Sequence, residues 1–229
     1  MTYVVSNIHG EYELFKQLLR TINFKDSDIM YILGDIVDYG EGGIDLINDI
    51  SMRLNVYPVV GEHDCTALRM LTGYLKMEGG EAPDPTFVSE MTDWVKDGGA
   101  PTLSAFRELG ADAREGVIDY LSDMALYDIA EVRGQEYILV HAGIRDFEPD
   151  IDLDSLDLED FISEPLDLTR KHYDDKIIIV GHNPTTEDNG GDGKIFYGNG
   201  SIDIDCGAGR GGRLACLCLE NRKEFYVGN

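Results

Sequence analysis

The sequence predicts an α/β fold with a parallel first sheet and a second, more antiparallel sheet packed against it. Three features carry this prediction. In residues 1–78, short apolar runs alternate with segments whose apolar residues repeat at helical spacing. From about Gly79 to Ala125 the pattern is helical, and the remainder of the chain is rich in strand-like runs.

The first part of the chain predicts strands at 2–6 (TYVVS), 30–35 (MYILGD) and 56–61 (VYPVVG), with helices at 11–22, 43–54 and 66–75. Strands that alternate with helices are typical of βαβ units, in which each helical crossover lets the next strand run parallel to the last. These strands should therefore form the parallel sheet.

The segment 79–125 is helical, with glycine and proline interruptions at EAPDPT and DGGAPT. The segment interrupts the alternation of strands and helices and does not begin a second series of βαβ units. We expect a helical cap or insertion within a single domain that spans residues 1–229, a length that suits one domain.

The second part of the chain predicts strands in YDIAEV, EYILVHAG, KIIIVGH, KIFYGNG, SIDIDCG, RLACLCL and EFYVGN. Turns such as GNG and ENRK separate several of them, as in hairpins. We expect these strands to make the second sheet. Cys216 and Cys218 alternate within RLACLCL and should be buried thiols on one face, not half of a disulfide framework.

Composition excludes several classes of partner. Nineteen basic residues against 44 acidic ones give a net charge of −25, and this field opposes nucleic acid backbones and anionic membranes. No apolar run approaches the roughly 18 residues of a membrane span, and MTYVVSNIHG has no signal-peptide pattern. We expect a cytoplasmic protein that binds neither nucleic acid nor membrane.

Four of the five histidines stand at the end of a predicted strand, in or just before a glycine-containing turn, and Asp35 in YILGDIVDYG has the same position. These histidines are His9, His63, His141 and His182. Strand ends in an open α/β sheet converge on one crevice, so the five side chains should meet in a metal site. Any one imidazole could be merely structural. His172 lacks the strand-end context, and we expect it at the surface.

The motifs SNIHG, GDIVDYG, GEHD, HAG and GHN occur in this order between residues 6 and 183. The series resembles the five motifs of calcineurin-like metallophosphoesterases, and most resembles the bacterial serine/threonine protein phosphatase branch (GDxHG, GDxxDRG, GNHE, HAG, GH). The closing IDCG and GGRLA segments are also similar to those of small bacterial members. The resemblance implies two packed mixed β-sheets flanked by helices.

The resemblance also implies two divalent metal ions, Mn, Fe or Zn, bridged by Asp35. Asn7 and His9 would complete the first site, and Glu62, His141 and His182 the second. Such a pair of ions binds a phosphoryl oxygen and activates a bridging hydroxide that attacks phosphorus. His63 would be the general acid that protonates the leaving alkoxide, oriented by Asp38 or Asp64.

Several positions depart from the family pattern. Asn7 stands where the family has Asp, and Glu62 where it has Asn, so the summed ligand charge is unchanged but shifts toward the second metal. Tyr39 replaces the Arg of GDxxDRG, and a loose alignment puts Glu164 at a second phosphate-binding Arg. Arg145 and Arg210 could compensate as substrate-binding residues, or could have surface or structural roles.

Three functions follow from this pattern. The first is a phosphoric monoester hydrolase acting on a phosphorylated protein or a small phosphoester, slowed by the missing arginines. The second is a nucleotide or dinucleotide polyphosphate hydrolase, because GEHD and HAGI are also similar to the diadenosine tetraphosphate hydrolase branch. The third is a non-catalytic member that binds metal or phosphate.

Overall fold

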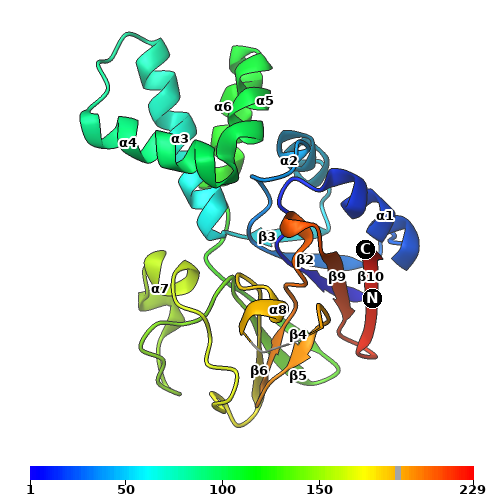
Figure 1. Cartoon of the computed structure of the whole chain (residues 1–229). Coiled ribbons are helices and arrows are strands. Elements are labelled where there is room, and N and C mark those ends of the chain that lie inside the picture. Colours follow the sequence, from blue (N-terminus) through cyan, green and yellow to red (C-terminus); the bar gives the residue numbers. More distant parts are fainter. Residues whose placement is uncertain (189–191) are drawn as a thin grey trace.

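Two five-stranded sheets lie against each other in the computed structural model, which describes residues 1–188 and 192–229 (Figure 1). The strand order is β10-β9-β1-β2-β3 in the first sheet and β4-β5-β6-β8-β7 in the second. Helices flank the sheets, so the predicted fold class of two mixed sheets with flanking helices is confirmed.

The first sheet begins as the sequence predicts. Strands β1 (Thr2–Val5), β2 (Ile29–Leu33) and β3 (Val56–Val59) run parallel, joined by helices α1 (Tyr12–Ile22) and α2 (Gly43–Ser51). Helix α1 buries Phe15, Leu18 and Ile22, an apolar stripe at helical spacing. It ends at Asn23, whose left-handed backbone stops the helix.

The assignment of all later strands to the second sheet was wrong. Strands β9 (Arg213–Cys218) and β10 (Lys223–Gly228) form a hairpin, and β9 pairs antiparallel with β1, so both belong to the first sheet. The local pattern of alternating residues identifies a strand but not its neighbours, which are chosen by long-range pairing. Cys216 and Cys218 are buried thiols on one face of β9, as predicted.

The second sheet is less antiparallel than expected. It consists of β4 (Asp128–Val132), β5 (Gln135–Leu139), β6 (Lys176–Val180), β8 (Ser201–Asp203) and the short β7 (Phe196–Tyr197). The central strands β5, β6 and β8 are parallel, and only the two edge strands β4 and β7 are antiparallel to their neighbours. Each sheet therefore contains three neighbouring parallel strands, β1-β2-β3 in the first and β5-β6-β8 in the second, which aligns strand ends for a shared site.

Alternation along each strand divides the interior into three apolar layers. On β1, Tyr3 and Val5 face the helices while Val4 faces the second sheet. On β5, Leu139 faces the first sheet while Ile138 packs under the 144–168 segment on the outer face. The middle layer holds the two sheets together, and it fixes how the loops of one sheet meet those of the other.

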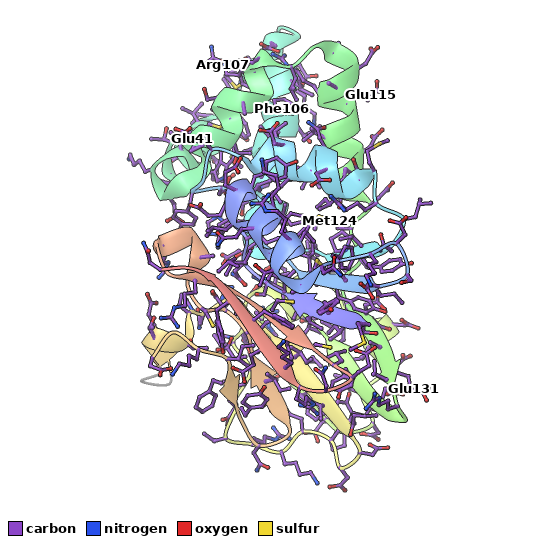
Figure 2. The ribbon with its side chains drawn as sticks, turned by 90° about the vertical axis from the view of Figure 1, so that its right-hand side faces the viewer. Glu41, Phe106, Arg107, Glu115, Met124 and Glu131 are labelled. Atoms are coloured by element: carbon purple, nitrogen blue, oxygen red, sulfur yellow. The ribbon has the colours of Figure 1, made fainter. Side chains whose placement is uncertain are left out.

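The helices between β3 and β4 form a cap that stands beyond one end of the sheets (Figure 1). Its elements are α3 (Glu62–Glu78), α4 (Pro85–Trp94), the turn η1 (Val95–Gly99), α5 (Ala100–Glu108) and α6 (Ala111–Ser122). Phe106, labelled among these helices in Figure 2, is fully buried with Trp94, Val117 and Leu121 in the layer that also contains α2. The helical segment is therefore longer than 79–125, because α3 already belongs to it.

Shorter elements complete the chain: η2 (Leu153–Ser155), α7 (Glu159–Ile162), α8 (Thr185–Asp188) and η3 (Ala208–Arg210). The prediction that His172 lies at the surface was wrong, since it is buried with its ring 4.9 Å from that of Phe147. Within residues 1–188 and 192–229, no helix combines the length and apolar character needed to cross a bilayer.

Candidate metal centre

Four of the five strand-end residues predicted from the sequence line one cavity of about 240 Å³, here called the metal cleft, and the fifth, His141, is fully buried beside Asp35. The lining residues of the cleft are His9, Asp35, Tyr39, Glu62, His63, Asp97, His182, Asn183, Pro184, Asp205, Gly207, Gly209 and Arg210. They come from the loops after β1, β2, β3, β6 and β8 and from the cap. The two sheets and the cap thus contribute jointly to the cleft.

Close backbone approach makes this convergence possible. Gly34 has a φ of +72°, and a Cβ at this position would lie 2.6 Å from Gly61 and 2.7 Å from the imidazole of His141. Only glycine fits between these loops. Unusual conformations also gather here, since Asn7, His9, Asp35, Asp38, Tyr39 and His182 have φ values of +47° to +74°. Left-handed backbone at residues other than glycine is costly, and it concentrates at functional sites.

Asp35 lies at the centre of the cluster and is 2% exposed. Its Oδ2 is 3.5 Å from Nε2 of His9, and its Oδ1 is 3.5 Å from Nε2 of His141. The backbone N–H of His63 donates to Oδ1 at 2.9 Å. Burial would raise the pKa of Asp35, but its histidine neighbours and the backbone N–H of His63 hold it below its usual range. The ionised carboxylate faces one histidine with each oxygen, as a shared ligand must.

The outer contacts of the imidazoles fit metal ligands. Nδ1 of His9 lies 3.2 Å from the carbonyl of Val37, and Nδ1 of His141 lies 2.9 Å from that of Leu33. A carbonyl only accepts, so each Nδ1 carries the proton and each Nε2 turns its lone pair toward Asp35. Burial lowers the pKa of His9 despite the charge of Asp35, which favours the neutral imidazole. Lone pairs that face a carboxylate at 3.5 Å leave room for a cation between them.

Two groups of donor atoms lie close enough to hold an ion each. His9, Asp35 and His63 form one, and Asp35, His141 and His182 form the other, with the donor atoms of each within 4.8 Å of one another. Nδ1 of His182 is 3.1 Å from Nε2 of His141 and 3.9 Å from Oε2 of Glu62. Glu62 therefore borders the second group without belonging to it.

Asn7 is held differently from a ligand. Its Oδ1 accepts hydrogen bonds from the Ser6 hydroxyl and from the backbone N–H of His182, the latter at 3.0 Å. Its Nδ2 donates to Oδ2 of Asp35 at 3.1 Å. A flipped amide would set oxygen against oxygen at Asp35 and N–H against N–H at His182. We infer that Asn7 presents an N–H, which cannot ligate a metal, toward the first group.

His63 belongs to the first donor group and also pairs with Asp38. Nδ1 of His63 is 2.9 Å from Oδ2 of Asp38. Burial would lower the pKa of His63, but the hydrogen bond to Asp38 and the charge of Asp35 raise it to about 9. Asp64 does not share this role, because its carboxylate accepts the backbone N–H groups of Ile36, Val37 and Gly61. Of the two predicted partners, the structure brings Asp38 to His63.

Two of the three candidate substrate-binding residues, Tyr39 and Arg210, line the metal cleft, and the third, Arg145, does not. The Tyr39 ring lies 4.9 Å from that of His9, and its hydroxyl donates to Asp97 at 3.3 Å. Arg210 is the one arginine or lysine among the described residues that line the metal cleft, and it pairs with Glu187 at 2.6 Å. Arg145 pairs instead with Asp160 and Glu164, at 3.3 and 3.4 Å, outside the lining of the cleft.

Sequence reasoning missed several residues of the site. Trp94 and Thr102 from the cap donate to the carboxylate of Asp38, at 2.8 and 2.7 Å. Asp97 and Asp205 line the cleft, and burial raises the pKa of Asp205 to about 7. The IDCG motif contains Asp205, so a signal existed for that residue. Nothing in the helical pattern of 79–125 distinguished Thr102.

Metal stoichiometry tests the inference about Asn7. We expect the wild-type chain to bind one Mn²⁺ tightly, at the Asp35, His141 and His182 group, and a second much more weakly. Asn7→Asp should raise the affinity of the second ion by roughly 10- to 100-fold, because a carboxylate oxygen replaces the N–H. Isothermal titration with elemental analysis measures both sites. Asn221→Asp, which adds the same charge in the β9–β10 turn, should change neither, and two equal tight sites in the wild type would contradict the inference.

Comparisons with known proteins agree with this geometry. Over residues 2–205 the chain matches the family model of calcineurin-like phosphoesterases. It is 29% identical over 104 residues to the symmetrical bis(5'-nucleosyl)-tetraphosphatase of Salmonella paratyphi B, a match covering 42% of this chain and only 36% of that protein.

Solved structures share the fold at low sequence identity. A crystal structure of a protein provisionally described as a diadenosine tetraphosphatase aligns over 100% of this chain and 93% of its own, with a TM-score of 0.67 and 19% identity. A protein serine/threonine phosphatase from Saccharomyces cerevisiae aligns over 94% and 71%, with a TM-score of 0.59 and 12% identity. The family match spans most of the chain and includes the motifs SNIHG, GDIVDYG, GEHD, HAG and GHN, and the chain therefore belongs to the calcineurin-like phosphoesterase family.

Proposed function

We propose that this protein is a metal-dependent phosphoric monoester hydrolase of the serine/threonine phosphatase type. The observation that carries the proposal is the His63–Asp38 pair beside the two donor groups that share Asp35. Two bound divalent cations, Mn, Fe or Zn, would supply Lewis-acid activation of a phosphoryl oxygen and of a water molecule. His9, Asp35, His141 and His182 would hold them, with Glu62 at the edge of the second group.

The protein's own acid chemistry centres on His63. A pKa raised to about 9 keeps its imidazole protonated at neutral pH, so it can give a proton to a departing alkoxide. Asp38 holds Nδ1, which leaves Nε2 as the nitrogen available to the leaving group. An acid placed beside the metals is useful for an ester whose alcohol is a poor leaving group, such as a phosphorylated serine.

The charges around the cleft favour monoesters over polyphosphates. An adjoining cavity of about 290 Å³ shares Glu62, His63 and Asp97 with the metal cleft and is also lined by Glu90 and Asp93. Its lining arginine, Arg69, is paired with Glu90 at 3.2 Å. A phosphate chain that extended past His63 would meet these carboxylates, and like charges so placed are costly. A neutral or cationic alcohol would meet no such barrier.

Hydrolysis of dinucleotide polyphosphates is the second candidate, supported by the similarity to the Salmonella tetraphosphatase. The match spans little more than a third of that protein, so nearly two thirds of its length lies outside the similarity. The acidic wall of the adjoining cavity argues for the monoesterase.

Substrate comparison in the presence of Mn²⁺ tests the choice. We expect kcat/KM for a phosphoserine peptide to exceed that for diadenosine tetraphosphate by about tenfold or more, and the gap to narrow as salt screens the carboxylates. Asp35→Asn should abolish both activities. A preference for the dinucleotide would support the second candidate, and metal-loaded protein that hydrolyses neither would make this a binding protein.

The role of His63 makes a separate prediction. His63→Asn should leave metal content unchanged and lower kcat toward the phosphoserine peptide by roughly 10² to 10⁴, the usual contribution of a general acid. His172→Asn, a matched change away from the cleft, should have no such effect. Loss of metal from the His63 variant, or unchanged turnover, would refute the role.

Because Tyr39 stands where the family has Arg, we expect a slow enzyme whose rate a pair of substitutions should increase. Tyr39→Arg alone should help little, because the Asp97 carboxylate that now binds the Tyr39 hydroxyl would pair with the new guanidinium. Combining Tyr39→Arg with Asp97→Asn should raise kcat/KM by up to about 10² to 10³, the usual contribution of one cationic or donor group at the phosphoryl oxygens. Asp97→Asn is the control. A brisk wild-type enzyme that the double change does not improve would show that Arg210 already supplies this charge.

A further inference from the structure

The carboxylate of Asp38 is held by the cap as well as by His63. It is fully buried and has three side-chain donors: Nδ1 of His63 at 2.9 Å, Nε1 of Trp94 at 2.8 Å and Oγ1 of Thr102 at 2.7 Å. Trp94 and His63 share Oδ2, while Thr102 binds Oδ1. Two of the three donors therefore come from helices α4 and α5, outside the family's strand-end motifs.

Thr102 contacts Asp38 at two points. Its hydroxyl oxygen accepts the backbone N–H of Asp38 at 3.0 Å, so its own proton is directed to Oδ1. Asp38 has a φ of +71°, a conformation that an aspartate adopts only when its surroundings stabilise it. The two contacts fix both the backbone and the carboxylate plane of the residue that orients His63.

The turn η1 brings both donors to this point. Trp94 ends α4 and Thr102 lies in the first turn of α5, and between them Gly98 has a φ of +96°. The Trp94 ring lies directly on Gly99, where a Cβ would be 2.2 Å from it. The carbonyl of Gly98 also accepts the backbone N–H of Tyr39 at 2.8 Å. The cap thus closes around residues 38–39 through backbone and side-chain contacts together.

We propose that Trp94 and Thr102 are positioning residues for the general acid, and that the cap is the element that keeps His63 aimed at the leaving group. This inference rests on the proposed function of His63. Without the Thr102 hydroxyl, Oδ1 of Asp38 loses its donor in a buried site, and the carboxylate rotates away from the geometry that holds the imidazole. The acid is then present but points away from the leaving group, while the proposed metal ligands His9, Asp35, His141 and His182 are untouched.

Leaving-group dependence separates this role from a general loss of structure. p-Nitrophenolate departs without protonation, whereas the alkoxide of a phosphoserine peptide needs the acid. Thr102→Val should lower kcat on the phosphoserine peptide by roughly 10- to 100-fold and kcat on p-nitrophenyl phosphate by less than about threefold, with metal content unchanged. Trp94→Phe, which keeps a ring but removes the N–H, should act in the same direction.

Three further variants serve as controls for Thr102→Val. Thr92→Val, in exposed α4 with its hydroxyl bonded only within the helix, should leave both activities unchanged. Thr102→Ser, which retains the hydroxyl, should restore the wild-type ratio. In a His63→Asn background, Thr102→Val should cost nothing further, because the two residues act through one group. Equal losses on both esters, or additive losses with His63→Asn, would overturn the proposal.

The positioning role can also be tested if the protein proves to have no monoesterase activity. If metal-loaded wild type hydrolyses neither ester, the monoesterase proposal fails, and positioning is read directly from the Nδ1–H proton of His63 by nitrogen-15 NMR. That proton should be protected from exchange in the wild type and in Thr92→Val, and unprotected in Thr102→Val. Unchanged protection in Thr102→Val would overturn the positioning role whatever the activity.

Discussion

The buried carboxylate of Asp35 is the group on which the rest of the centre depends. A charge removed from water costs several kcal/mol unless partners replace its hydration. Here the backbone N–H of His63 and the amide of Asn7 supply donors, and two imidazoles face the remaining directions. These partners come from both sheets and from the start of the cap. The Asp35 carboxylate is therefore stabilised only when the two sheets and the cap are correctly placed relative to one another. The apolar layer between the sheets maintains the placement of the sheets.

Asp38 is the second buried carboxylate in the same loop after β2, and it links the site to the cap. The family motifs account for its pairing with His63, but its other two donors belong to helices inserted between β3 and β4. Trp94 and Thr102 thus connect the cap directly to the residue that pairs with His63.

The departures from the family pattern leave the summed ligand charge unchanged and remove one positive charge from the cleft. Glu62 adds a carboxylate at the cleft, Asn7 removes one from the first metal group, and Tyr39 removes a guanidinium. Asp97 and Asp205 add further carboxylates to the lining, while Arg210 is partly neutralised by Glu187. In a chain of net charge −25, a cleft lined in this way gains little from electrostatic attraction of phosphate.

The sequence by itself determined the local structure and the identity of the groups that meet. The periodicity predicted β1, β2, β3, α1 and α2 in order, and the strand-end positions predicted that His9, Asp35, His141 and His182 share one crevice, because parallel strands carry their ends to one edge. Only the tertiary structure decided that β9 pairs with β1, that Asn7 turns an N–H toward Asp35, that Asp38 and not Asp64 holds His63, and that Trp94 and Thr102 complete the contact. Each of these depends on which atoms approach across long sequence separations, and hydrogen-bond direction at a buried amide or carboxylate is set by neighbours that no local pattern contains.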